Sequence, residues 1–187
     1  DYTLSELQTF DFGKGFEGAY KGLRIVTFED ILQKFACHVV MNIHIKSFNN
    51  FDPMDEAYLK KIISTIRKYD CEKYVYFMTG NDVLMHQLGD LAPDIARCVG
   101  GGNAKDLVVE RAIEMGCEKV QFVRGHFTKE KIELAHAHGI RCNVFWSDDP
   151  TQAAEWLDWG MDVILTNDYQ RMADALGDRV KTGFIGS

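Results

Sequence analysis

The sequence predicts an α/β fold built on a parallel sheet with crossover helices. From residue 39 onward, short apolar runs with strand composition alternate with helical patterns roughly every 22 to 25 residues. Several predicted helices stop at a glycine, as at Gly116, Gly139 and Gly160. Such alternation is typical of a β/α barrel or of a doubly wound sheet, and the periodicity alone leaves both open.

The bulk composition predicts one globular domain. The chain has 187 residues, of which 46% are hydrophobic and 26% charged. A formal net charge of −7 without a basic run argues against a nucleic-acid-binding surface. No stretch approaches the ~20 apolar residues of a membrane helix. The five cysteines lack zinc-ligand spacing, so we expect reduced thiols and a cytoplasmic protein.

The N-terminal part predicts two short helices that begin with capping boxes. Thr3 and Glu6 have the required spacing ahead of a helix over residues 4–10. Thr27 and Asp30 repeat this spacing ahead of a second helix. The glycine-rich loop between the two follows no strand and lacks Gly-Lys-Ser/Thr, so we expect no phosphate-binding loop there.

The stretch from Val39 to Lys46 is the most informative predicted strand. Valine and isoleucine dominate it, and the side chains of a strand alternate between two faces. One face therefore carries Asn42, His44 and Lys46, an amide, an imidazole and an ammonium in a row. Burying such a row without partners would cost several kcal/mol. This face therefore lines a site, unless it is the wet face of an antiparallel strand.

The later elements follow in alternation. The predicted strands cover residues 74–78, 95–99, 120–123, 142–146 and 163–166. The predicted helices cover residues 53–69, 82–91, 104–115, 129–138, 150–159 and 169–176. The expected helix starts are Pro53 in a first turn, Asn81 or Asp82 as an N-cap, Thr128 as an N-cap and Pro150 in a first turn.

Chemistry is expected at the carboxyl ends of the strands, which share one edge in either architecture. His44 and Lys46 are the sharpest pair there, because a neutral imidazole can ligate a metal and an ammonium can hold a phosphate. Two residues do not complete a hydrolytic metal centre, which needs about three protein ligands. Further along, Asp148 and Asp168 could simply cap helices, and Trp146 could be a packing residue.

Several segments, in order, resemble the glycerophosphodiester phosphodiesterase family. Asn42-Ile43-His44-Ile45-Lys46 resembles the family's Asn-Ile-Glu-Ile-Lys strand. The run from Gly160 to Asp168 resembles its closing Gly-Val-Asp-Gly-Ile-Ile-Thr-Asp segment. The remaining matches are residues 3–7, 12–13 and 25–32, Ala92-Pro93-Asp94, Phe145 near the family's substrate-side tryptophan, and Asp149-Pro150.

The resemblance implies a (β/α)8 TIM barrel that cleaves glycerophosphodiesters to glycerol 3-phosphate and an alcohol, in lipid and glycerol metabolism. It implies a divalent metal ion, Mg²⁺ or Ca²⁺, and upstream His-Arg-Gly, Glu-x-Asp and His-Asp motifs that this sequence lacks. The family's catalytic histidines lie in those motifs. We therefore expect residues 1–187 to form a single domain, the C-terminal portion of an incomplete barrel, inactive alone and without catalytic residues of its own.

The resemblance also implies roles for four residues of this chain. His44 stands where the family has a glutamate as a metal ligand, which would shift preference toward a transition metal or loosen the site. His44 is thus a substitute ligand, a contact to phosphate when protonated, or the mark of a lost site. Lys46 is expected to bind the phosphate, and Phe145 and Trp146 to wall the glycerol or alcohol side.

Two other functions stay open at this point. One is a catalytically inactive barrel that binds a phosphorylated ligand or a protein partner. The other is an unrelated β/α barrel isomerase or aldolase, because a lysine at a strand end can form a Schiff base. For the leading function the partner is a small-molecule glycerophosphodiester.

Overall fold

Six parallel strands form one sheet whose spatial order follows the order of the chain. The structure is a computed structural model that describes residues 2–15, 18–47 and 52–179. The strands are β1 Met41–His44, β2 Val75–Thr79, β3 Ala96–Val99, β4 Lys119–Val123, β5 Arg141–Phe145 and β6 Val163–Ile164. All neighbouring pairs are parallel, as predicted. A doubly wound sheet would reverse its strand order partway, so this sheet winds like a barrel.

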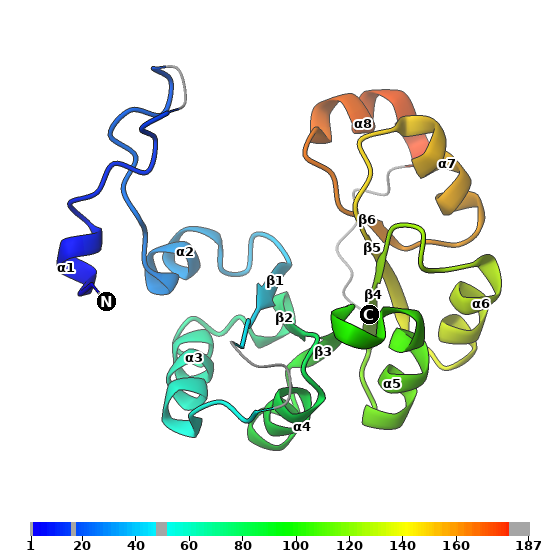
Figure 1. Cartoon of the computed structure of the whole chain (residues 1–187), viewed down its shortest axis with the longest axis horizontal. Coiled ribbons are helices and arrows are strands. Elements are labelled where there is room, and N and C mark those ends of the chain that lie inside the picture. The colour runs from blue at the N-terminus through cyan, green and yellow to red at the C-terminus, as the bar shows by residue number, and fades with distance from the viewer. Residues whose placement is uncertain (1, 16–17, 48–51, 180–187) are drawn as a thin grey trace.

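Helices α3 to α7 join successive strands, α8 follows the last strand, and all six cover the outer side of the curled sheet (Figure 1). They are α3 Glu56–Lys68, α4 Asp82–Leu91, α5 Val108–Met115, α6 Lys129–Ala137, α7 Pro150–Asp158 and α8 Tyr169–Leu176. Short 3-10 helices cover Glu72–Tyr74, Gly102–Leu107 and Gly177–Arg179. The predicted helix over 104–115 is therefore split, because the backbone leaves helical geometry at Ala104 and α5 begins only at Val108.

The helix starts largely follow the predicted caps. The Asn81 side chain accepts a hydrogen bond from the Leu84 N–H, and Pro150 occupies the first turn of α7. The placement of Pro53 in a first turn was wrong. There the Asp55 carboxylate accepts from the Tyr58 N–H, so α3 begins three residues after the proline.

The N-terminal segment carries α1 Leu4–Leu7 and α2 Phe28–Phe35, and both predicted capping boxes are present. The α1 end of this segment projects away from the sheet (Figure 1). The first helix is shorter than predicted and buries no side chain. The second helix buries Leu32, which packs in the same core cluster as β2.

The outer face of the sheet is apolar and packs against the helices in two clusters. One cluster joins β3, β4 and β5 to α5, α6 and α7, and the other joins β2 to α2, α3 and α4. Phe122 in the first cluster and Phe77 in the second are almost completely buried. Burial of such side chains is the main stabilisation of the strand framework, which in turn positions the strand ends.

The inner, concave face is mixed, with polar side chains beside a small apolar cluster of Tyr76, Met78 and Cys98. Asn143 on β5 donates from Nδ2 to the Tyr76 hydroxyl on β2 over 3.2 Å, and the Lys119 ammonium lies 5.2 Å from the centre of the Tyr76 ring. Asn143 is on β5 and Lys119 is on β4, and neither strand is a neighbour of β2 in the sheet. These contacts with Tyr76 therefore cross the concave side. Burial raises the pKa of Tyr76 to about 12. Within the described residues, three buried amide oxygens have no hydrogen-bond partner, those of Asn42, Gln121 and Asn143.

All five cysteines are free thiols, and four of them are buried. Among the helices of the described ranges, none has the length and apolar character needed to cross a bilayer.

Candidate functional site

A cavity of about 320 Å³ opens at the carboxyl ends of β1, β2 and β3. His44, Lys46 and Gln121 line it with the backbone of three glycines, Gly80, Gly100 and Gly101, and with Ile45, Ser47, Met78 and Thr79. A Cβ atom added to Gly101 would lie 2.8 Å from Cγ2 of Val123, so only glycine fits this wall without a shift. The structure thus brings His44 and Lys46 together at the predicted edge of the sheet.

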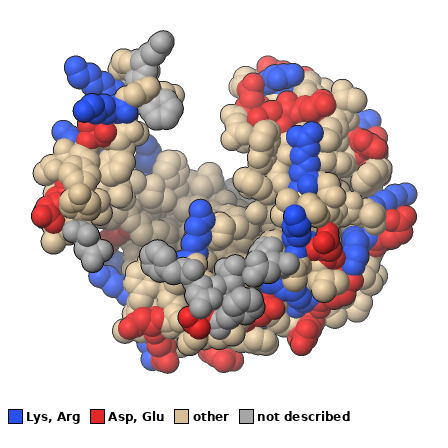
Figure 2. All heavy atoms as spheres, in the orientation of Figure 1, with Lys and Arg blue, Asp and Glu red and all other residues tan. Residues whose placement is uncertain are grey.

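A larger groove of about 640 Å³ adjoins the same two residues. It lies along β1 and is lined mainly by apolar side chains of α2, α3 and the loop before α3, including Phe28, Met54 and Ile62. In the described sheet β1 pairs only with β2, so its other edge is open. Figure 2 shows the molecule hollowed on one side, between the N-terminal segment and the region of α7 and α8. His44 and Lys46 therefore line both the strand-end cavity and the groove.

The surroundings of His44 favour its neutral form. Partial burial lowers the pKa of this imidazole, and the charge of Lys46 lowers the pKa further. A neutral imidazole keeps a lone pair for a metal or for a proton donor. The strand-end cavity has no carboxylate among its described lining residues, whereas Asp52 and Asp55 line the adjoining groove.

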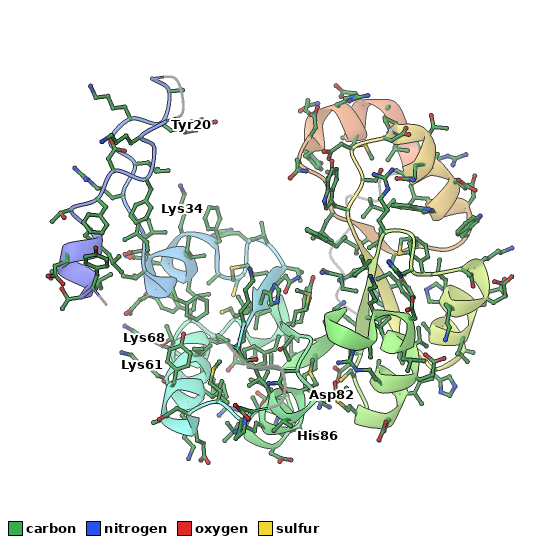
Figure 3. All side chains as sticks on the ribbon, in the orientation of Figure 1. Tyr20, Lys34, Lys61, Lys68, Asp82 and His86 are labelled. Atoms are coloured by element: carbon green, nitrogen blue, oxygen red, sulfur yellow. The ribbon has the colours of Figure 1, made fainter. Side chains whose placement is uncertain are left out.

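Arg111 of α5 holds the loops that form the floor of the cavity, a role that the sequence analysis missed. Its guanidinium donates to the carbonyl oxygens of Gly80, Gly100 and Gly101 over 3.0–3.4 Å. It also pairs with the carboxylate of Asp82 at the start of α4, which Figure 3 labels. The Arg111 side chain is only 11% exposed, so one buried cation joins the ends of β2 and β3.

Phe145 and Trp146 lie at the carboxyl end of β5, on the predicted edge of the sheet. Both are exposed, at 49% and 37%. Neither is among the described residues that line the cavity or the groove beside His44. The structure therefore leaves these two aromatic side chains accessible but does not join them to His44 and Lys46.

Asp148 links the loops after β5 and β6. Its carboxylate accepts from the Thr166 hydroxyl at 2.7 Å, from the Asn167 N–H at 2.7 Å and from the Asn167 side-chain amide at 3.0 Å. The alternative that Asp148 caps a helix was wrong, because Asp149 caps α7 instead. For Asp168 that alternative is confirmed, since its side chain accepts from the Arg171 N–H at the start of α8.

The bonds to Asp148 predict an acid-dependent contribution to stability. The Asn167 and Thr166 donors lower the pKa of this carboxyl. A lowered folded-state pKa stabilises the fold above the ordinary carboxyl range, and this contribution is lost as pH falls through the lowered pKa. We expect Asp148→Asn to lower the unfolding temperature near pH 7 and the deficit to shrink below about pH 4. Thermal unfolding across this range measures it, and a deficit independent of pH would contradict the role.

A family model described as the glycerophosphoryl diester phosphodiesterase family matches residues 1–171. The chain is 23% identical over 190 residues to the glycerophosphodiester phosphodiesterase of Bacillus subtilis (strain 168). The alignment covers 89% of this chain and 62% of that protein, so the chain spans less than two thirds of this curated relative.

Solved structures share the fold. A glycerophosphodiester phosphodiesterase from Parabacteroides distasonis aligns with a TM-score of 0.76 and 16% identity, over 96% of this chain and 72% of its own. An Oleispira antarctica phosphodiesterase in complex with the product sn-glycerol-3-phosphate aligns with a TM-score of 0.77 and 18% identity, over 93% and 70%. The expected incomplete TIM barrel is thereby confirmed, with six of the eight strands of a closed barrel. Because the family model covers most of its length, the chain belongs to the glycerophosphoryl diester phosphodiesterase family.

Proposed function

We propose that this barrel serves the hydrolysis of glycerophosphodiesters to sn-glycerol 3-phosphate and an alcohol. The observation that carries the proposal is that His44 and Lys46 line one strand-end cavity in a barrel of this family. The product bound in the Oleispira antarctica phosphodiesterase, which has the same fold, supports the substrate class. The curated relative, a glycerophosphodiester phosphodiesterase by name, supports it independently.

Lys46 is the proposed phosphate-binding residue. Its ammonium is a compact point charge in a cavity without described carboxylates, which suits an anionic phosphodiester. During attack on phosphorus, negative charge grows on the phosphoryl oxygens, and a fixed cation there lowers the barrier. Phe145 and Trp146 are proposed to contact the glycerol or alcohol part from the neighbouring rim, where both are accessible.

The described residues do not complete a site for the family's divalent cation. Among those that line the strand-end cavity, only His44 is of a common ligand type, and a hydrolytic site needs about three protein ligands. We propose that His44 contributes one nitrogen ligand and that the other ligands, together with the acid and base, belong to strands that would close the barrel beside β1. In that assembly, residues 1–187 form one domain with those strands.

The decisive assay is release of sn-glycerol 3-phosphate from glycerophosphocholine. It uses the polypeptide that carries residues 1–187 in its native reading frame, with Mg²⁺, Ca²⁺, Zn²⁺ or a chelator present. Release that depends on a metal supports the proposal. Failure of the folded protein to release product under every condition would overturn it.

Substitutions at His44 test its role as a ligand. We expect His44→Ala to raise the metal concentration needed for half-maximal activity by at least about tenfold. Even the loss of a residue that only hydrogen-bonds to a metal ligand lowers metal affinity by this factor. His44→Glu restores the oxygen donor that Mg²⁺ and Ca²⁺ prefer, and we expect it to raise affinity for these ions. The measurement is activity against free metal concentration, with His138→Ala as the control. Unchanged metal dependence in His44→Ala would contradict the ligand role.

One observation favours a second candidate, a catalytically inactive barrel that binds a phosphorylated ligand. By the resemblance, His44 stands where the family has a glutamate, and no described carboxylate lines the strand-end cavity. Calorimetric titration with sn-glycerol 3-phosphate distinguishes the two. Binding of sn-glycerol 3-phosphate without hydrolysis of glycerophosphocholine favours this candidate. The third possibility, an unrelated isomerase or aldolase, is excluded by membership of the family.

A further inference from the structure

Three side chains of metal-ligand type converge far from the strand-end cavity. His136 lies at the end of α6, Cys142 is the second residue of β5, and Asp162 immediately precedes β6. Their ligand atoms all lie within 4.8 Å of one another. Cys142 and Asp162 are at the amino ends of their strands, whereas His44 and Lys46 are at a carboxyl end. This cluster is thus separate from the proposed phosphodiester chemistry.

Existing hydrogen bonds hold the Asp162 carboxylate between His136 and the Cys142 backbone, while the Cys142 thiol lies 4.0 Å from the Ile140 carbonyl oxygen. Nε2 of His136 lies 2.9 Å from Oδ2 of Asp162, and the same oxygen accepts the Cys142 backbone N–H at 2.7 Å. Both bonds use one carboxylate oxygen. Among the described residues no hydrogen bond engages the other oxygen, which points to spare ligand capacity. A His–Asp pair alone would be an ordinary structural contact, but here a cysteine sulfur completes a three-atom set.

The donor set matches one class of ion. Thiolate and imidazole ligands favour Zn²⁺ and similar transition metals, while Mg²⁺ and Ca²⁺ need oxygen-rich sites. Three protein ligands and one water complete a tetrahedral zinc shell. The side chains of His136 and Asp162 are 39% and 28% exposed, so an ion can reach them from solvent. Cys142 is fully buried behind them.

The sulfur is protonated without a metal, because burial raises the pKa of the Cys142 thiol to about 12. A coordinating ion displaces that proton, since a metal-bound thiol is deprotonated. The sulfur–hydrogen bond breaks, a sulfur–zinc bond forms, and the proton leaves to solvent. No oxidant or reductant is required.

We propose that His136, Cys142 and Asp162 form a zinc site that fastens α6 to the amino ends of β5 and β6. Within the described ranges, these three residues are the group of His, Cys, Asp or Glu side chains whose ligand atoms lie close enough to share one ion. A bound ion would link the end of α6 and the start of β5 to Asp162, which lies 26 residues after His136 and 20 residues after Cys142. Its expected effect is on stability, and it does not rest on the proposed enzymatic function.

Titration of the polypeptide with Co²⁺ after chelator treatment tests the site directly. Tetrahedral cobalt with a thiolate ligand shows visible d–d bands and a sulfur-to-metal charge-transfer band. We expect about one equivalent of Co²⁺ to develop the charge-transfer band fully and Zn²⁺ to abolish this band. We also expect Zn²⁺, but not Mg²⁺, to raise the unfolding temperature in proportion to the logarithm of its free concentration.

Matched variants locate the binding. Cys142→Ala should abolish the charge-transfer band, and His136→Gln should weaken zinc affinity at least tenfold. Their controls are Cys117→Ala, another buried free thiol, and His138→Gln, two residues from His136. His44→Ala should leave the sulfur-to-metal charge-transfer band unchanged, because His44 is at the carboxyl end of β1 and Cys142 is at the amino end of β5.

Two outcomes would overturn the proposal. One is a cobalt spectrum without the thiolate band in the unsubstituted protein. The other is unchanged zinc affinity in His136→Gln, which replaces a partly exposed side chain and so stays informative even if Cys142→Ala fails to fold.

Discussion

Replacing Lys46 by methionine is expected to lower kcat/KM for glycerophosphocholine by about 100- to 1000-fold, the range seen when one preorganised donor to a developing charge is removed. Methionine keeps much of the length of the side chain but removes the cation of the strand-end cavity. Most of the loss should lie in kcat, because the charge on the phosphoryl oxygens grows in the transition state.

The Lys46→Met variant should also change the pH dependence of activity. The ammonium of Lys46 is one of two causes that lower the pKa of His44, so its removal should raise that pKa toward its usual value. We expect the acid limb of the pH profile to move to higher pH. Lys46→Arg should keep part of the activity, because it retains the charge with a different donor geometry.

Lys61→Met is the matched control for Lys46→Met. Lys61 lies on α3 in Figure 3 and is exposed, and it lines neither the cavity nor the groove. The activity of Lys61→Met should equal that of the unsubstituted protein. Steady-state assays of the polypeptide in its native reading frame give both comparisons. Activity of Lys46→Met within about threefold of the unsubstituted protein would contradict the phosphate role, since about 100-fold is expected.

Arg111→Met is expected to lower the free energy of unfolding by about 2 kcal/mol, within the range for losing hydrogen bonds from a charged donor. The variant removes donors from three glycine carbonyls at the cavity floor and leaves the Asp82 carboxylate without this partner. Asp82 is half exposed, so water solvates its carboxylate in the variant, and we expect the loss to come mainly from the glycine carbonyls.

Urea denaturation measures the Arg111→Met effect, with Arg67→Met as the matched control. Arg67 pairs with Asp94 at 2.9 Å, but both side chains are about half exposed, so this variant should lose no more than about 1 kcal/mol. Equal losses in the two variants would show that the Arg111 contacts do not stabilise the loops. We also expect Arg111→Met to weaken ligand binding in the cavity, because the loops it holds form the floor.

The fold was largely predictable because its signals are local. Capping boxes, glycine stops and strand composition each lie within a few residues, and they placed the strands and most helix starts. Errors arose where a nearby residue competed, as when Asp55 rather than Pro53 opened α3. The choice of a barrel over a doubly wound sheet needed the strand order, which no local pattern contains.

The candidate site was only partly predictable. Strand alternation placed His44 and Lys46 on one face, and the structure shows both lining the same cavity. Arg111 was missed because its acceptors lie 10 to 31 residues away and a helical pattern does not show where an arginine reaches. The His136, Cys142 and Asp162 cluster was missed for the same reason, since its three members come from different elements. The cytoplasmic location stays a prediction.

The sequential order of the strands also bears on how the molecule assembles. Each strand pairs with the one before it in the chain, at separations from 20 residues, as for Tyr76 and Ala96, to 34 residues, as for Met41 and Val75. Folding can therefore proceed by adding one β/α unit at a time, with short loop closures and low contact order throughout. During synthesis each new unit docks on a template already formed by its predecessor. A closed barrel would also pair its first and last strands, which are the most distant in sequence, so we expect such a closure to be slower than any of these steps.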